Sequence, residues 1–324
     1  MTTLDLTHHL TAALAPMLGE EGRLIVGFSG GLDSSVLLHA LAQNDGLKAR
    51  LIALHVHHGL SPNADVWEAH CQAVSENLGV AFISARVTVT GDGNGIEQAA
   101  RNARYDVFQQ HANSHDLVLV AHHNDDQVET FFQRLFRGSG LTGLASMAAV
   151  RPLFDDSDVL LVRPLLDVSR KQLEAYAQAQ QLTWVEDESN TDTRYERNWW
   201  RNELLPQIWQ RFTGREESLK RTLEQLQSDQ ALLQELLKPE IDACIAYCDW
   251  PGTNELICSI AALNDKPKHH RPYLLRGWLA GCGVPMPSAA MLERIQREVI
   301  EAAEDRNPQV VLGDICVRRY QQHL

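Results

Sequence analysis

A run of seven residues near the amino terminus has the composition of a phosphate-binding loop: Ser29, Gly30, Gly31, Leu32, Asp33, Ser34 and Ser35. Paired glycines let the backbone turn sharply and bring bare N–H groups to an anion, and the serine hydroxyls add further donors. The run lacks the Gly-Lys-Ser/Thr ending of a Walker A motif. A carboxylate beside phosphates is explained if Asp33 holds magnesium. The alternative is an ordinary turn in which Asp33 caps a helix.

A second group of residues with side chains suited to binding or catalysis follows the apolar run 116–121. Asp125, Asp126 and Glu129 lie within one helical turn, so we expect three carboxylates on one face, where they could bind magnesium or an ammonium group. The structural alternative is that Asn124 caps this helix, that Gln127 closes a capping box, and that the two aspartates complement the helix dipole.

Two stretches supply cations. In the predicted helix 95–112, Arg101 and Arg104 share a polar side, where the default explanation is a surface helix with a Glu97–Arg101 pair. Further on, three arginines alternate with aromatic residues (Arg194, Tyr195, Arg197, Trp199, Trp200 and Arg201), a mixture typical of RNA contacts. The alternative for the tryptophans is burial in the core.

The predicted strand 49–56 ends in three histidines, His55, His57 and His58. Ligands of open α/β sheets lie at the carboxyl ends of strands, so these side chains are expected beside a nucleotide base. A metal site is disfavoured, because we see no cysteine or glutamate to complete a first shell.

The elements that must position these residues alternate along the chain. Apolar runs at 24–28, 49–56, 80–89, 116–121 and 159–166 are separated by helical patterns, which predicts a doubly wound, mainly parallel α/β sheet. The composition changes near residue 214, and leucines at helical spacing follow from 215 to 237. We therefore expect a catalytic domain over 1–214 and a mostly helical domain over 215–324, which ends in a hairpin-like segment around Gly313 and Asp314.

Composition limits the class of protein. The net charge of −13 argues against a general nucleic-acid binder, so an RNA enzyme would have to concentrate positive charge locally. The six cysteines form no Cys-x-x-Cys pair, which disfavours iron–sulfur or zinc sites. Without a long apolar run or a signal peptide, we expect a cytoplasmic protein with no membrane partner. A homodimer is an open alternative.

Five segments carry a resemblance to a known family. SGGLDS resembles the loop of the N-type ATP pyrophosphatases, or PP-loop superfamily. HVHHGLSPNADVWEAHC, the Ala-Arg-x-x-Arg-Tyr element, HHNDDQVETFFQRLFRGSG and the pattern Glu-Asp-x-Ser-Asn…Arg-Asn-x-x-Arg…Pro narrow it to the tRNA(Ile)-lysidine synthetases. The resemblance implies ATP-dependent ligation of free L-lysine to carbon 2 of the wobble cytidine of tRNA(Ile) with a CAU anticodon. The cytidine is adenylated first, pyrophosphate and AMP leave, and the codon read changes from AUG to AUA.

The resemblance also implies roles for individual residues. ATP contact falls to the loop 29–35, His55, Val56 and His122, with magnesium at Asp33; lysine recognition falls to Asp126 and Glu129, either of which could deprotonate the amine. The resemblance places Arg104 on the ATP phosphates, with Arg101 as the alternative. It places Arg197 and Arg201 in the site, with Asp187, Ser189 and Asn190, and tRNA contact with Arg137, Tyr195, Arg197, Asn198 and Arg201. We expect aromatic support for the unstacked cytidine near Tyr195.

The sequence departs from the family in two respects. Asn124 replaces a residue that is commonly apolar, and we expect this chain to lack the further carboxyl-terminal domain that grips the acceptor stem in many members. We expect either a shorter form of the enzyme or a cut chain. The alternatives are a thiolase-type PP-loop enzyme, although such enzymes commonly use a Cys-x-x-Cys, and a catalytically silent protein that binds ATP or tRNA.

Overall fold

The computed structural model describes residues 5–89, 95–154, 157–248, 255–284, 286–302, 308–312 and 315–324. The chain divides into two compact units, Met1–Gln227 and Ser228–Leu324. The division falls inside the long helix α11 (Glu216–Cys244), not at residue 214 as the composition suggested. The reason is that Leu219 and Leu223, in the first turns of α11, pack against Val128 and Leu205 of the first unit.

The first unit is built on one six-stranded sheet with the order β3-β2-β1-β4-β6-β5. Its strands are β1 (Leu24–Gly27), β2 (Leu51–His57), β3 (Ala81–Arg86), β4 (Leu117–Leu119), β5 (Val150–Pro152) and β6 (Leu160–Val162). All neighbours pair in parallel except β5, an antiparallel edge strand. The chain winds outward in one direction through β1, β2 and β3 and in the other through β4 and β6, so the topological switch point lies between β1 and β4. The predicted doubly wound, mainly parallel sheet is confirmed.

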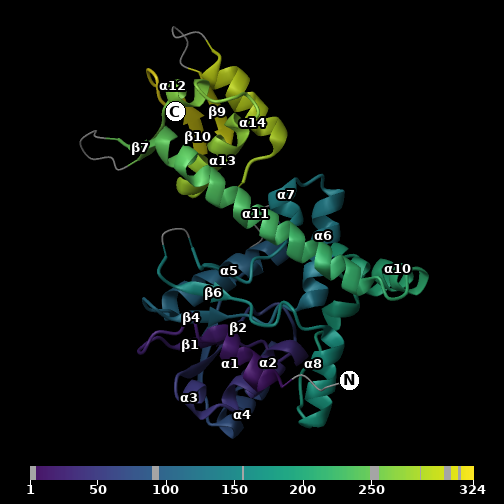
Figure 1. The fold of residues 1–324 in the computed structure, drawn as a ribbon. Coiled ribbons are helices and arrows are strands. Elements are labelled where there is room, and N and C mark those ends of the chain that lie inside the picture. The colour runs from purple at the N-terminus through teal and green to yellow at the C-terminus, as the bar shows by residue number, and fades with distance from the viewer. Residues whose placement is uncertain are drawn as a thin grey trace. The chain divides into compact units, whose positions relative to one another are not determined.

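Helices cover both faces of this sheet (Figure 1). They are α1 (Leu6–Leu14), α2 (Leu32–Ala42), α3 (Asp45–Lys48), α4 (Ala64–Leu78), α5 (Ile96–His111), α6 (Asn124–Phe136), α7 (Leu141–Leu144), α8 (Arg170–Ala179), η1 (Glu188–Thr191, 3-10), α9 (Glu196–Trp199), η2 (Trp200–Leu204, π) and α10 (Leu205–Arg211). Side chains alternate along β1: Leu24 and Val26 join the core beneath α1 and α2, whereas Ile25 joins the core beneath α5. This alternation gives the three-layer arrangement of a buried parallel sheet.

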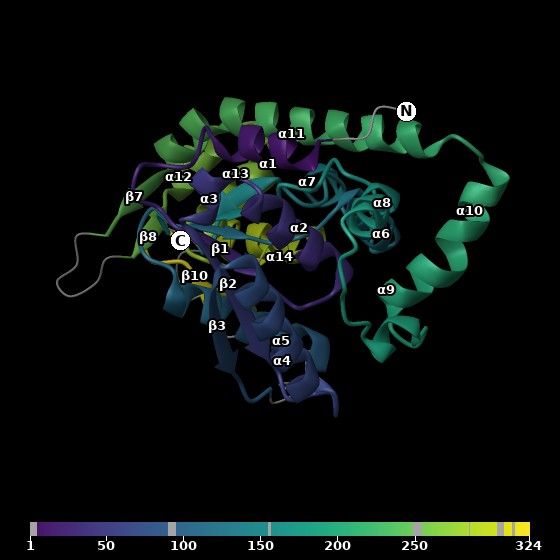
Figure 2. The same cartoon turned by 90° about the horizontal axis from the view of Figure 1, so that it is seen from below.

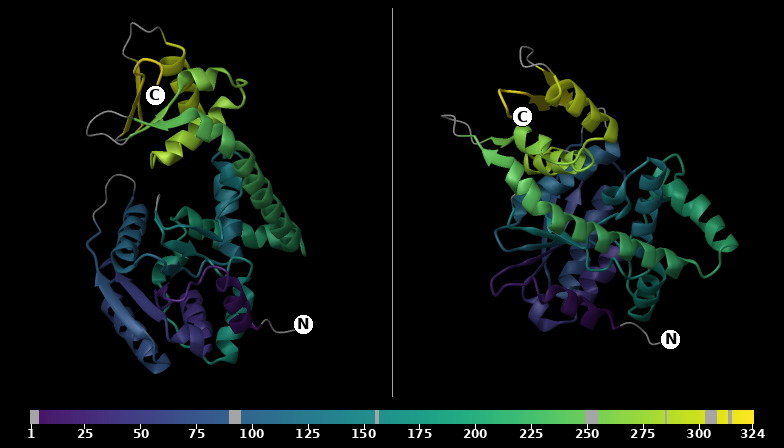
Figure 3. Two further views of the ribbon diagram at one scale, coloured as in Figure 1. Left: turned by 60° about the vertical axis from the view of Figure 1, so that its left-hand side comes forward. Right: turned by 45° about the horizontal axis from the view of Figure 1, so that its top comes forward.

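The second unit, green to yellow in Figure 3, gathers helices around two short antiparallel strand pairs. Its elements after α11 are β7 (Ile245–Tyr247), β8 (Leu256–Cys258), α12 (Ile260–Asn264), α13 (Arg271–Gly281), α14 (Ala289–Ile295), η3 (Gln296–Ile300, π), β9 (Gln309–Leu312) and β10 (Ile315–Arg318). The pairing of Leu312 with Ile315 confirms the predicted antiparallel pair, although Gly313 and Asp314 lie outside the described residues. No helix in the described part of the chain is long and apolar enough to cross a bilayer.

Candidate active site

The glycine-rich loop joins β1 to α2 at the switch point. Gly30 has φ +82°, and a Cβ at this position would lie 2.8 Å from Cys71 Sγ, so the loop conformation requires glycine. The N-cap residue of α2 is Gly31, and no side chain caps the first turn, which leaves its N–H groups open for an anion. Ser34 and Ser35 donate their hydroxyls to the carbonyls of Gly31 and Gly30, at 3.0 and 3.3 Å. These two hydroxyls therefore brace the loop. The donors that remain for a phosphate are backbone N–H groups and the hydroxyl of Ser29, whose Oγ lies 3.1 Å from Ser34 Oγ.

Asp33 lies inside the first turn of α2 and is not the helix cap, so the structural alternative for this residue was wrong. Its Oδ2 is 3.1 Å from Arg170 Nη1 and 3.6 Å from His123 Nε2. Its Oδ1 is buried and has no hydrogen-bond partner in the described structure. A buried carboxylate oxygen without a donor is suited to a hard cation, so the residue fits the magnesium expected here.

His123 and Arg170 are site residues that the sequence analysis missed. The imidazole of His123 is 2% exposed and lies within 3.6 Å of the Asp33, Asp125 and Asp126 carboxylates. Burial would lower the pKa of His123, but the carboxylates outweigh it and raise the pKa to about 10. Arg170 also donates its backbone N–H to Asp125 at 2.8 Å. The two cations thus tie the loop to the start of α6. Arg170 is the first residue of α8, far from Asp33 in the sequence, so no local pattern indicated its role.

Asp126 and Glu129 face two arginines from a distant part of the chain. Arg197 donates to Glu129 Oε2 at 2.7 Å and to Asp126 Oδ1 at 2.6 Å. Arg201 donates to Glu129 Oε1 and Oε2 at 2.6 and 2.9 Å and to Asp126 Oδ1 at 3.1 Å. The remaining oxygen, Asp126 Oδ2, accepts the His123 backbone N–H at 2.9 Å. All four carboxylate oxygens are therefore engaged.

The start of α6 differs from the predicted capping scheme. The N-cap residue is His123, one position before Asn124, and Asp126 accepts its backbone N–H. Gln127 closes no capping box; its amide exchanges two 2.8 Å hydrogen bonds with the backbone of Met147. Asp125 turns to His123 and Arg170 instead of joining Asp126 and Glu129, because a helix start directs successive side chains to different sides.

The two arginines are positioned by the near-continuous helical segment from α9 through η2 to α10 (Figure 2). Trp200 is 4% exposed and its ring stacks on Phe132 of α6 at a centroid distance of 5.5 Å, so this tryptophan is core. Trp199 is 42% exposed. Arg197 and Arg201 are four residues apart and so share one helix face, which the buried Trp200 holds against α6.

The segment before α9 folds back onto the glycine-rich loop. The Val185 N–H donates to the Gly30 carbonyl at 2.9 Å. Asn198 donates its amide to the Ser189 and Asp192 carbonyls at 2.7 and 3.0 Å. Asp187 accepts the Ser189 N–H at 2.8 Å. Asn198 therefore stabilises this turn, since its side-chain amide donates both of these hydrogen bonds to backbone carbonyls. Its contact with RNA stays a prediction.

Exposed residues flank α9. Asn190 is exposed, and its carbonyl accepts the amide of Asn202 at 2.9 Å. Tyr195 is 48% exposed. Arg137 is also exposed and forms an ion pair with Glu196. Tyr195 and Arg137 are therefore open to a large partner on this side of the site.

Neutral histidines and one isolated arginine complete the site. His55 shares a 2.9 Å hydrogen bond with the Phe28 carbonyl, and burial lowers its pKa. Burial also lowers the pKa of His122 to about 3, and its Nδ1 has no partner among the described residues. Burial lowers the pKa of His58, as it does that of His122, and the positive charge of Arg104 lowers both further. Burial also lowers the pKa of Arg104 itself, and the nearby charges of Arg101 and Arg197 lower it further. Arg101 points elsewhere and donates to the Tyr105 hydroxyl at 3.0 Å.

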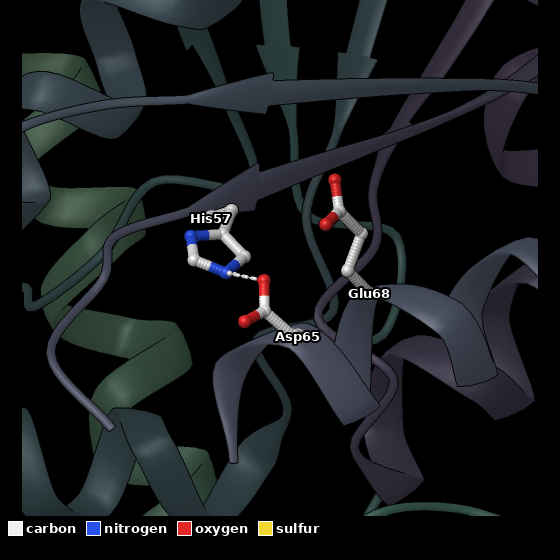
Figure 4. A group of neighbouring side chains, drawn as sticks. All are labelled: His57, Asp65 and Glu68. Atoms are coloured by element: carbon white, nitrogen blue, oxygen red, sulfur yellow. Dashed lines mark ion pairs between the residues drawn. The ribbon is translucent and has the colours of Figure 1, made fainter. Parts of the chain in front are cut away.

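The end of β2 brings one of the predicted histidines beside two carboxylates. β2 continues to His57, whose Nε2 lies 3.3 Å from Asp65, and Glu68 comes from the same helix as Asp65 (Figure 4). Carboxylates that the sequence analysis did not foresee therefore stand beside His57. However, Arg86 forms ion pairs with both, 2.8 Å from Asp65, so a guanidinium already offsets one of their two negative charges.

Comparison with known proteins identifies the family of the chain. Residues 3–208 match the PP-loop domain model and residues 259–324 match the TilS substrate binding domain model. A tRNA(Ile)-lysidine synthase from Actinobacillus pleuropneumoniae serotype 3 is 44% identical over 94% of this chain and 70% of its own length. One from Photorhabdus laumondii is 42% identical over 99% of this chain and 71% of its own length.

A solved structure supports the fold. The U34-tRNA thiolase NcsA from Methanococcus maripaludis superposes with a TM-score of 0.52 at 16% identity, over 69% of this chain and 78% of that one. The thiolase shows the architecture alone, whereas the curated relatives match in sequence over most of the chain. This chain belongs to the tRNA(Ile)-lysidine synthase family.

Proposed function

We propose that this enzyme ligates free L-lysine to carbon 2 of the wobble cytidine of a CAU-anticodon tRNA(Ile), with ATP as the activating substrate. The names of the relatives and the PP-loop domain support ATP use and a tRNA substrate. The observation that carries the finer assignment is the buried pair Asp126 and Glu129, which His123 links to Asp33 of the loop. A buried carboxylate pair next to a phosphate loop suits a cationic nucleophile that attacks an adenylated intermediate.

The first step would activate the cytosine. The carbonyl oxygen on carbon 2 is a poor leaving group and must first be adenylated. It attacks the α-phosphorus of ATP and displaces pyrophosphate, which the open N–H groups of α2 would bind. Asp33 Oδ1 would hold magnesium, which neutralises phosphate charge when bound. Arg104 has no ion pair with a described carboxylate, so its charge is free to stabilise the α-phosphate. The neutral imidazoles of His55 and His122 suit contacts with the nucleoside.

The second step needs the ammonium of lysine beside Asp126 or Glu129, which would accept its proton before attack on carbon 2 and release of AMP. In the described structure these carboxylates are 6% and 1% exposed and already hold two guanidinium groups. We propose that lysine replaces one arginine. Exchange of one cation for another keeps the cluster neutral, whereas addition of a third cation would leave a buried net charge.

The displaced arginine needs an anion of its own. Arg197 and Arg201 are about one-third exposed, so either can turn toward a phosphate of ATP or of the RNA. A planar guanidinium binds carboxylate and phosphate by the same two-pronged geometry, which makes such an exchange inexpensive. This predicts that bound nucleotide and tRNA favour the binding of lysine.

The deciding experiment is incorporation of labelled lysine into a transcript of CAU-anticodon tRNA(Ile) with ATP and magnesium. The control transcript carries uridine in place of the wobble cytidine. We expect incorporation in the cytidine transcript alone, with release of AMP, and none with Asp33→Ala, which should still bind tRNA. AMP release without incorporation would refute the nucleophile, and an unchanged rate in Asp33→Ala would refute the mechanism.

A thiolase-type reaction has less support. Cys71 lies next to the loop, but burial raises the pKa of its thiol to about 12, which leaves no thiolate at neutral pH.

A further inference from the structure

A second concentration of positive charge lies between α5 and the edge strand β5. Arg101 and Arg151 place their guanidinium carbons 4.8 and 5.4 Å from the centre of the Tyr105 ring. Together with Leu153 and Phe154, these three residues line a cavity of about 490 Å³. No residue of the glycine-rich loop lines this cavity, so it is distinct from the nucleotide site at the switch point.

The arginines here lack the carboxylate partners seen in the active site. Within the described ranges, neither Arg101 nor Arg151 forms an ion pair, and Arg151 Nη1 donates to the backbone carbonyls of Pro152 and Leu153 at 2.7 and 2.9 Å. Arg163, 4% exposed, adds a third charge near Tyr105, and its Nε has no described partner. Burial would raise the pKa of the Tyr105 hydroxyl, but the three arginines outweigh it and lower the pKa.

Arginines with no ion pair to a described carboxylate thus gather around the Tyr105 ring, although the chain has a net charge of −13. Guanidinium groups bind phosphate oxygens bidentately, while an aromatic ring and apolar side chains support a sugar or base. The carboxylate of Asp106 also lines the cavity but pairs with neither arginine in the described structure. A flexible polyanion with a flat organic portion therefore matches the cavity better than a small inorganic anion.

We propose that Arg101, Tyr105 and Arg151 form an RNA-backbone site, which grips a phosphate of the tRNA substrate away from the reacting cytidine. The proposal rests on the proposed function for the identity of the RNA. It assigns Arg101 to RNA and leaves Arg104 to the ATP phosphates. It also supplies part of the local positive charge that an acidic RNA enzyme requires.

The test uses the full chain with Arg151→Gln and Arg151→Glu. The matched controls are Lys48→Gln and Lys48→Glu, because Lys48 precedes β2 at the opposite end of the strands from the glycine-rich loop. Binding of the tRNA(Ile) transcript is measured between 50 and 200 mM salt. Each lost phosphate contact makes the slope of log K against log salt less negative by about 0.7 to 0.9. Over this range the affinity of the wild type should therefore fall about threefold more than that of Arg151→Gln.

We expect a higher KM for tRNA in both Arg151 variants, with kcat at saturating tRNA and KM for ATP unchanged, and no effect in the Lys48 variants. Salt slopes equal to that of the wild type in both Arg151 variants would overturn the site. Thermal unfolding of Arg151→Gln checks the fold, since the substitution removes the charge but keeps a polar side chain that can donate hydrogen bonds. If the wild type fails to incorporate lysine but Arg151→Gln makes the slope of log K against log salt less negative, the RNA site is supported and the proposed reaction is refuted.

Discussion

Removal of Arg201 should strengthen the binding of lysine in the absence of tRNA. Arg201 makes three hydrogen bonds to Glu129 and Asp126, at 2.6, 2.9 and 3.1 Å. A hydrogen bond to a charged group contributes about 1.5 to 3 kcal/mol. Because the side chain is one-third exposed, solvent screens these bonds, and we take about 1.5 to 3 kcal/mol for the whole arginine and not for each bond.

This energy is the cost that lysine must meet to displace Arg201. A difference of 1.4 kcal/mol corresponds to about a tenfold change in Kd, so Arg201→Met should bind lysine about ten- to a hundredfold more tightly. Methionine removes the charge but keeps much of the apolar stem, and the incoming ammonium restores two cations for two carboxylates. Turnover should fall at the same time, because the variant lacks a group for the phosphates.

The assay is calorimetric titration of lysine into the protein loaded with a non-hydrolysable ATP analogue. Arg194→Met is the matched control, because Arg194 is 89% exposed on its side chain and pairs with Asp192 alone among the described residues. Its lysine affinity should equal that of the wild type. Equal or weaker lysine binding by Arg201→Met would refute the exchange and would instead make Arg201 part of the lysine site.

Two stability predictions follow from buried contacts. Gly30→Ala should lower the free energy of unfolding by about 1 to 3 kcal/mol, because φ is +82° and the new Cβ meets Cys71 Sγ, whereas Gly31→Ala, which has no close contact, should unfold near the wild-type temperature. Asp116→Asn should cost about 2 to 3 kcal/mol at pH 7 in denaturant titration, because it breaks the pair with Arg23. Burial would raise the pKa of Asp116, but the bonds from Arg23 outweigh it and lower the pKa, so the stabilisation is present above pH 4 and is lost as the pH falls through the depressed pKa. A difference between wild type and Asp116→Asn that persists undiminished at pH 2 would contradict this.

The local features of this protein could be predicted from its sequence. Alternating apolar runs and helical patterns indicated the doubly wound sheet, since each reflects the period of its own backbone. The sharp turn at Gly30 was predictable because its φ of +82° favours glycine. The spacing of Asp126 and Glu129 placed both on one face of α6, since residues three apart share a helix face.

Tertiary structure decided which groups these residues meet. Arg197 and Arg201 stand 68 and 72 positions after Glu129, and no local pattern indicates that they saturate its oxygens. In the same way, α8 brings Arg170 to both Asp33 and Asp125, which lie far from it in the sequence. Backbone preferences act over one or two helical turns, whereas these ion pairs join residues that are far apart in the sequence and that only the tertiary fold brings together. The sequence therefore determined the elements and the chemical groups of the site, and the fold alone determined their partners and charge.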